Sequence, residues 1–279
     1  MKQAGGSGRP LPGQYCATQE SPSLNAPPAA PVIVWFRDDL RLSDHPALNA
    51  AASTGAPVIC LYVLDESPSL RPPGGAARWW LAQSLRALQR QLGAIGSTLA
   101  VSRGAAAKVI PTLARAAQAR AVVWNEIADK SHRAIEFEVA AALRASGIDT
   151  QSFPGDLLVA PQAIRSKDGR GMRVFTPFWK RVLAMGDPPK PLPAPTSLRW
   201  PTAPLASKSI ESFGLEPTKP DWAAGLRKSW LPGEEAAQAR LTRFLSGDAK
   251  SYAGERNRPD RDVTSGLSPH LRFGEISPR

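Results

Sequence analysis

Five short apolar runs alternate with longer amphipathic segments in the first part of the chain, and this alternation restricts the possible folds more than any other feature. The run Val32–Phe36 contains only β-branched and aromatic residues, which is typical of a strand buried on both faces. Further strands are predicted at Val58–Val63, Thr98–Val101, Ala121–Trp124 and Ile148–Phe153. Helices are predicted between them at Pro46–Ala52, Ala77–Leu92, Ala105–Ala117 and Lys130–Ala145. Strands that alternate with helices predict an α/β fold: a doubly wound, parallel, five-stranded sheet with helices on both faces.

Changes in composition divide the 279 residues into four parts. Residues 1–31 are rich in Gly, Pro, Ser and Ala and are predicted to be a disordered N-terminal extension. Residues 32–160 form the predicted α/β domain, and residues 161–230 a connector that is dense in proline and serine over Pro188–Pro220. Residues 231–279 return to a helical pattern, with a helix at Gly233–Leu245, but they are too few to bury a core of their own.

Charge and cysteine content limit the classes of protein to which this chain can belong. The formal charge of +11 favours a polyanionic partner such as nucleic acid, although Arg- and Ala-rich chains are often simply basic. No run of eighteen apolar residues and no apolar leader segment occur, so we expect a cytoplasmic protein that does not cross a membrane. Two cysteines cannot form a disulfide framework, and Cys60 is predicted to be a core residue.

Several common sites are missing from the sequence. No glycine-rich phosphate loop follows a predicted strand, and His45, His132 and His270 lack the spacing of metal ligands, so no metal site is expected. The charged segment Arg37–Leu48 is interpreted as a loop whose Asp and Arg side chains join a strand end to a helix start. Asp168–Gly169 predicts a turn.

The segment Arg173–Arg181 combines Phe178 and Trp179 with several cations. Aromatic rings flanked by Lys and Arg can stack on bases. We favour the alternative, a helix that packs its aromatic face and leaves its cations in solvent.

The C-terminal segment contains the most informative pattern. Tyr252 and Arg256 are four residues apart and are expected on one helical face. The run Thr264–Ser268, which reads TSGLS, offers hydroxyls and backbone N–H groups that suit a phosphate. An ordinary helix N-cap, with Thr264 or Ser268 as the capping residue, explains the same run equally well.

Five segments, in this order along the chain, together resemble the DNA photolyase/cryptochrome family, in particular a class I-like cyclobutane pyrimidine dimer photolyase. They cover most of the chain from Val32 onward and are Val34–Leu48, Gly74–Leu88, Arg173–Arg181, Leu231–Leu245 and Ser251–Arg279. The resemblance implies the photolyase N-terminal domain with its antenna site, then a linker and the incomplete start of an all-α FAD-binding domain.

The resemblance also implies a function. Members of the family use reduced FAD and blue light to split cyclobutane pyrimidine dimers in UV-damaged DNA, acting on a base flipped out of the duplex. By position, the FAD-binding residues are Tyr252, Thr264, Ser265, Gly266, Leu267 and Ser268, and Arg256 is placed toward DNA. Relatives often carry a longer side chain at Gly266, so the loop is expected to be looser here. The full-length protein is expected to be a monomer.

An antenna chromophore, methenyltetrahydrofolate or a deazaflavin, is a further expectation from the resemblance. Folate-binding members carry an Asn–Glu pair in a stretch that reads Asp129–Lys130 here, with Asn125–Glu126 close by. The identity of the antenna stays open.

Family members continue for well over a hundred residues beyond the position of Arg279, and no catalytic residue is assigned before it. All eight tryptophans lie before residue 231, so none matches the family's electron-transfer chain. We therefore expect this polypeptide alone neither to hold FAD tightly nor to repair DNA. The alternatives are a cryptochrome-type blue-light photoreceptor, a stand-alone antenna or nucleotide-binding module, and a basic DNA-binding protein without chemistry.

Overall fold

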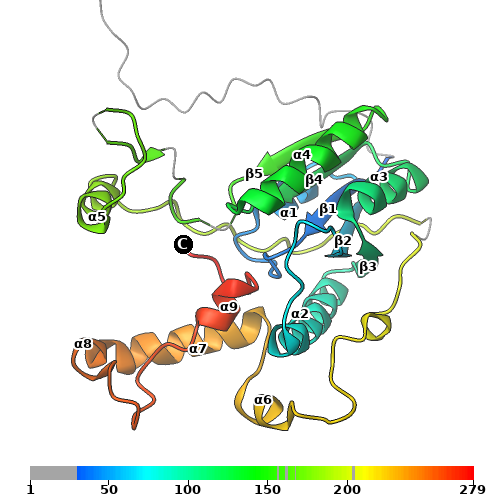
Figure 1. The fold of residues 1–279 in the computed structure, drawn as a ribbon. Helices are drawn as coiled ribbons and strands as arrows, with labels where there is room; N and C mark the ends of the chain where they lie inside the picture. The colour runs from blue at the N-terminus through cyan, green and yellow to red at the C-terminus, as the bar shows by residue number, and fades with distance from the viewer. Residues whose placement is uncertain (1–29, 156, 161–162, 167, 203–204) are drawn as a thin grey trace, which may run out of the picture.

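A parallel sheet of five strands forms the centre of the protein (Figure 1). The computed structural model describes residues 30–279 except 156, 161–162, 167 and 203–204. The strands are β1 (Val32–Phe36), β2 (Val58–Asp65), β3 (Leu99–Gly104), β4 (Ala121–Asn125) and β5 (Asp149–Phe153). They match the predicted strands to within a few residues at each end. The expected α/β class is confirmed.

The strand order is β3-β2-β1-β4-β5. Strand β1 lies in the middle, where Val32 pairs with Val58 of β2 and with Ala121 of β4. Because the chain moves outward from β1 first in one direction and then in the other, the order reverses between β1 and β4. Crevices at such reversals, at the carboxyl ends of the strands, are the usual ligand sites of open α/β sheets.

Helices cover both faces of the sheet, as predicted. The helices of the first half of the chain are α1 (Pro46–Ser53), α2 (Gly75–Ala94), α3 (Ala106–Ala116) and α4 (Lys130–Arg144). One core joins Val34 and Phe36 to α1 and α2, and the other joins Ile33 and Trp35 to α3 and α4. Alternate β1 side chains therefore enter opposite cores, which explains the uninterrupted apolar run in its sequence. Cys60 is a buried core residue, as predicted.

The connector packs closely onto the α/β domain. Two adjacent connector residues form backbone hydrogen bonds with the domain: the Leu198 amide donates to the Ile95 carbonyl, and the Arg199 carbonyl accepts from the Val58 amide. Leu198 is buried in the core shared by α1 and α2. Phe213, the last residue of the short helix η2 (Glu211–Phe213), is buried in the same core. The proline-rich segment thus completes the domain although it has no helical or strand periodicity.

Helix α5 (Phe175–Leu183) contradicts the expected packing of its aromatic residues. It stands apart from the sheet in Figure 1, and Phe175 and Trp179 are 71% and 42% exposed while they stack on each other. The helix and its solvent-exposed cations were predicted correctly, and Phe178 is half-buried, but Trp179 is exposed where packing was predicted. Nothing in the described part of the chain covers the face that carries Phe175 and Trp179. The turn predicted at Asp168–Gly169 is present, since the Gly169 amide donates to the Ser166 carbonyl.

The last part of the chain is helical and lies against the α/β domain. It comprises α6 (Ala224–Ser229), α7 (Glu234–Ser246), η3 (Asp248–Lys250), α8 (Tyr252–Glu255) and α9 (Ser268–Arg272). Phe273, directly after α9, is buried in the core of α1 and α2. The predicted disordered extension falls almost entirely outside the described residues, as does Cys16.

Candidate functional site

The predicted flavin and DNA contacts Tyr252 and Arg256 do share one face. Tyr252 begins α8, and its ring meets the ring of Phe244 in α7 edge to face, with centroids 5.7 Å apart. The Arg256 guanidinium lies 5.8 Å from the centroid of the Tyr252 ring. This cation–π contact places an arginine beside a partly exposed aromatic ring, an arrangement that suits a negatively charged aromatic ligand.

The loop Thr264–Ser268 leaves its hydroxyls largely unused. Of its hydroxyl oxygens, only Ser265 Oγ takes part in a hydrogen bond within the described chain, a long one of 3.5 Å from the Leu267 amide. Residue Gly266 adopts a left-handed conformation with φ of 60°, which favours glycine. The alternative interpretation of this run as an N-cap is wrong. Leu267 occupies the cap position of α9, and no side chain caps the helix.

A buried contact between a carboxylate and a histidine fixes α9, and with it the loop, to the α/β domain. Glu275 is fully buried, and its carboxylate lies 2.5 Å from His270 Nδ1. The same carboxylate accepts hydrogen bonds from the Trp80 indole at 3.2 Å and from the Gly233 amide at 2.8 Å, and a further one from the Ser84 hydroxyl. Four donors from α2, the start of α7 and α9 therefore converge on one carboxylate. The network orients the loop relative to the sheet.

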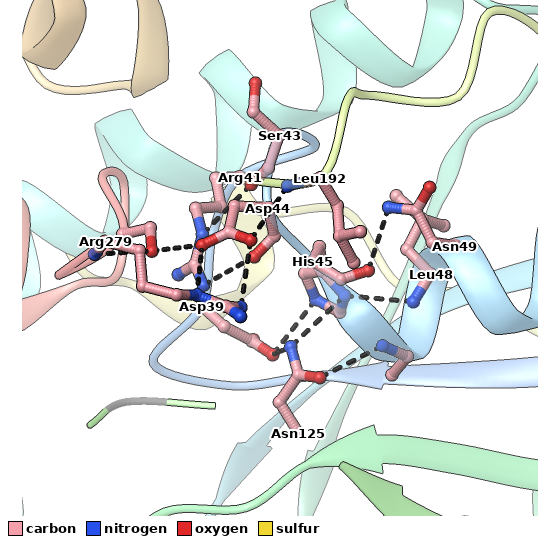
Figure 2. A network of polar contacts seen from close by, with 12 residues as sticks. Asp39, Arg41, Ser43, Asp44, His45, Leu48, Asn49, Asn125, Leu192 and Arg279 are labelled. Carbon is pink, nitrogen blue, oxygen red and sulfur yellow. Dashed lines mark hydrogen bonds and ion pairs between the residues drawn. The ribbon is translucent and has the colours of Figure 1, made fainter. Parts of the chain in front are cut away.

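A second network lies in the charged segment between β1 and α1 (Figure 2). His45 Nδ1 accepts from the Leu48 amide at 3.0 Å, which leaves Nε2 to face Asp39 at 3.0 Å. Burial opposes ionisation of Asp39, but His45 and the hydrogen bond from the Arg37 amide outweigh it and lower the pKa of Asp39 to about 2. The interpretation of this segment as a strand-to-helix connection held by charged side chains is confirmed.

The segment between β1 and α1 also anchors the C-terminal part of the chain. Burial opposes ionisation of Asp44, yet the Ser277 hydroxyl, the Leu192 amide and Arg279 lower its pKa. Arg279 lies 2.9 Å from Asp44 (Figure 2). The Glu234 carboxylate of α7 accepts from the amides of Leu42 at 2.7 Å and Ser43 at 2.9 Å. Glu234 thus binds across the interface, a contact that its position in the first helical turn did not suggest.

A pocket of about 610 Å³ opens at the carboxyl ends of β1 and β2. Its wall combines aromatic and charged side chains from the sheet, the start of α4 and the end of α9, including Trp35, Asp38, Tyr62, Asp129, His132 and Arg272. Asp38 and Arg272 form an ion pair of 2.5 Å across the junction between the sheet and α9. Burial raises the pKa of Asp38, and Arg272 opposes this effect.

The pocket distinguishes between the two stretches considered for the residue pair that binds the antenna chromophore. Asp129 lines it, whereas Asn125 and Glu126 do not. Asn125 is buried, and its side chain bonds to Asp39 at 2.9 Å and to the Ala47 amide at 3.1 Å. Among the residues that the structure describes, no group of three His, Cys, Asp or Glu side chains could hold a metal ion, and no helix is long and apolar enough to cross a membrane.

Comparison with known proteins identifies the family. The family model described as DNA photolyase matches residues 32–196, which include the whole sheet and α5. The chain belongs to the DNA photolyase family. The predicted resemblance to the photolyase/cryptochrome family is confirmed at the level of the family.

Relatives of this photolyase-family chain include both repair enzymes and photoreceptors. The deoxyribodipyrimidine photo-lyase of Agrobacterium fabrum is 42% identical over 89% of this chain and 52% of its own length. Cryptochrome-1 of Arabidopsis thaliana is 34% identical over 88% of this chain and 36% of its own length. A crystal structure of a bacterial class III photolyase from Agrobacterium tumefaciens superposes with a TM-score of 0.86 at 41% identity, covering 91% of this chain and 52% of that one. The chain spans about half the length of the curated photolyase that it matches.

Two parts of this photolyase-family site were missed in the sequence. Glu275 and His270 lie five positions apart, and nothing in that spacing reveals that the other partners of Glu275 come from α2 and the start of α7. The pocket was missed because its walls come from four separate segments. Its best sequence signal was the set of polar residues directly after β1, since carboxyl ends of parallel strands share one edge of the sheet.

Proposed function

We propose that this chain supplies the α/β domain and the first flavin-binding segment of a light-driven DNA repair enzyme that acts on cyclobutane pyrimidine dimers. The family membership carries the proposal, together with the contact between Tyr252 and Arg256 at α8 and the position of the loop Thr264–Ser268 at the start of α9. When bound, FAD would supply the photochemical electron transfer that reverses the dimer.

The residues present fit the phosphate end of FAD. Thr264, Ser265 and Ser268 would donate hydroxyl hydrogen bonds to the pyrophosphate. Tyr252 would pack beside the flavin nucleotide. The buried Glu275–His270 pair would keep the loop oriented before the ligand arrives, which lowers the entropic cost of binding.

A DNA partner is supported by the charge of the chain. Arg256 forms no ion pair with a carboxylate in the described chain and is exposed at the end of α8. It would contact a phosphate of the DNA backbone, and the net charge of +11 would strengthen non-specific attraction.

The test is repair by a chimaera that joins this chain to the C-terminal half of the Agrobacterium fabrum photolyase. Light-dependent reversal of a thymine dimer in an oligonucleotide, with none in the dark, is the expected result. Bound flavin without repair would instead favour the cryptochrome alternative. Absence of both flavin and repair, while the A. fabrum enzyme is active in the same assay, would contradict the proposal.

The pocket supports a second role within the chain itself, as an antenna module. Its volume of about 610 Å³ lies in the range of small-molecule sites, and its aromatic and charged lining suits a planar, charged chromophore. We propose that it binds methenyltetrahydrofolate or a deazaflavin. Titration of the purified chain with each compound, followed by absorbance and fluorescence, tests this. A His132→Ala variant should bind more weakly, and equal binding by both chains would contradict the assignment.

A further inference from the structure

Arg240 is held against the loop Thr264–Ser268 in a defined position. It lies in α7, one turn before Phe244, the residue whose ring contacts Tyr252. Its guanidinium carbon lies 4.7 Å from the centroid of the Trp230 ring, in a cation–π contact. One face of α7 therefore contacts both parts of the proposed flavin site: Arg240 lies against the loop, and Phe244 contacts Tyr252.

The conformation of Gly266 makes room for this arginine. A Cβ atom at position 266 would lie 3.2 Å from Arg240 Cζ and 3.4 Å from Arg240 Cδ, and nearer still to one guanidinium nitrogen. Any other residue at this position would displace the guanidinium, apart from the strain of φ at 60°. The absence of a side chain at Gly266, which the sequence suggested would loosen the loop, instead lets a cation lie directly over its backbone.

The charge of Arg240 has no counter-charge in the described chain. Seven arginines lie in residues 234–279. Five of them pair with carboxylates: Arg243, Arg258, Arg261, Arg272 and Arg279. Neither Arg240 nor Arg256 forms such a pair among the described residues. Arg240 is half-buried, so its charge is partly removed from water without a compensating anion.

We propose that Arg240 is a phosphate-binding residue that neutralises the pyrophosphate of a dinucleotide seated on Thr264–Ser268. The inference rests on the proposed function, which places FAD at this loop. Trp230 holds the guanidinium plane, Gly266 lets it approach the loop, and its remaining N–H groups are available for a bidentate contact with phosphate oxygens. The loop hydroxyls and Arg240 together would supply neutral and charged donors to one pyrophosphate.

Inorganic pyrophosphate is a suitable probe because it tests the phosphate site without a flavin pocket. The ¹⁵N-labelled chain is titrated, and the shifts of the Gly266 amide and the Arg240 side-chain N–H resonances are followed. We expect both resonances to shift along binding curves with the same dissociation constant. Arg240→Ala should weaken pyrophosphate binding about tenfold or more, because a charge-assisted hydrogen-bonded pair is lost. Arg240→Lys should bind with intermediate affinity because it keeps the charge but loses the planar fork.

Arg243→Ala is the matched control. Arg243 lies on the same helix, but it is exposed and lies 3.5 Å from Asp262, so its removal should leave pyrophosphate binding within about twofold. If Arg240→Ala, still folded by its amide spectrum, binds pyrophosphate at Gly266 as tightly as the unaltered chain, the role of Arg240 is overturned while the loop assignment stands. If pyrophosphate at millimolar concentration moves neither resonance of the unaltered chain, both assignments are overturned, whereas repair by the chimaera tests the proposed activity separately.

Discussion

Individual buried charges in this protein lie where segments from distant parts of the sequence meet. Asp39 faces Asn125, Asp44 faces Arg279, and Glu275 faces Trp80. A buried carboxylate is tolerable only when donors surround it, and its partners then become costly to remove. Each of these residues therefore fixes the position of a neighbouring segment.

The acid stability of the protein should depend on Asp39. Its folded-state pKa of about 2 lies below the ordinary value of 3.8, so the unfolded chain binds more protons between these values. The stabilisation, about 2 kcal/mol, is present in full above about pH 4 and is lost as the pH falls towards 2. Asp39→Asn should lower the free energy of unfolding at pH 7 and flatten its acid dependence, as measured by urea denaturation from pH 2 to 7. Asp187→Asn, at an exposed site, is the control, and an unchanged acid profile in Asp39→Asn would contradict the prediction.

At the scale of elements, the end of α9 packs backbone against backbone on the loop after β1. The Leu40 amide donates to the Phe273 carbonyl at 3.1 Å, and Arg41 Nη1 donates to the Gly274 carbonyl at 3.0 Å. Gly274 has φ of 62°, and a Cβ there would lie 2.5 Å from Asp39 Cα. Contacts this close cannot be relieved by a change of rotamer, because backbone atoms are on both sides.

Gly274→Ala should therefore be more destabilising than its backbone conformation alone explains. Gly186 is a matched control because its φ is 80° and a Cβ atom added there would have nothing within 4 Å. We expect Gly186→Ala to cost about 1 kcal/mol of stability from the left-handed conformation. Gly274→Ala should cost about 1–3 kcal/mol more from overpacking, as measured by chemical denaturation. Equal losses in the two variants would show that α9 is not held tightly against the loop.

For the molecule as a whole, net charge and the placement of unpaired arginines should govern DNA binding. A surplus of eleven positive charges predicts salt-dependent, non-specific affinity for duplex DNA. Arg256 is exposed on the proposed DNA side, whereas Arg258 is already neutralised by Asp260 at 2.7 Å. The two arginines are two residues apart in the chain, so they allow a local comparison.

Arg256→Ala should reduce the slope of log affinity against log salt concentration by about one, because one phosphate contact is lost. Arg258→Ala should change that slope by much less. Fluorescence anisotropy with a labelled duplex at several salt concentrations measures both. Identical slopes for the two variants would place Arg256 outside the DNA contact.

The sequence was sufficient for the α/β class, the strand and helix positions, and the shared face of Tyr252 and Arg256, because these depend on short-range periodicity. It also identified Arg37–Leu48 as a connection held by charged side chains, since a strand end and a helix start are local features. It failed for the aromatic face of α5, because periodicity reports that a face is apolar and says nothing of what covers it.

The amino-acid pattern alone determined which segments become strands and helices, since alternation and helical spacing act over a few residues. Only the tertiary structure decided which charges meet: Glu234 with the amides after β1, Glu275 with α2, and Arg240 with Gly266. These contacts join residues up to 195 positions apart in the chain. Their geometry depends on how the helices pack on the sheet, and a local sequence pattern carries no record of that packing.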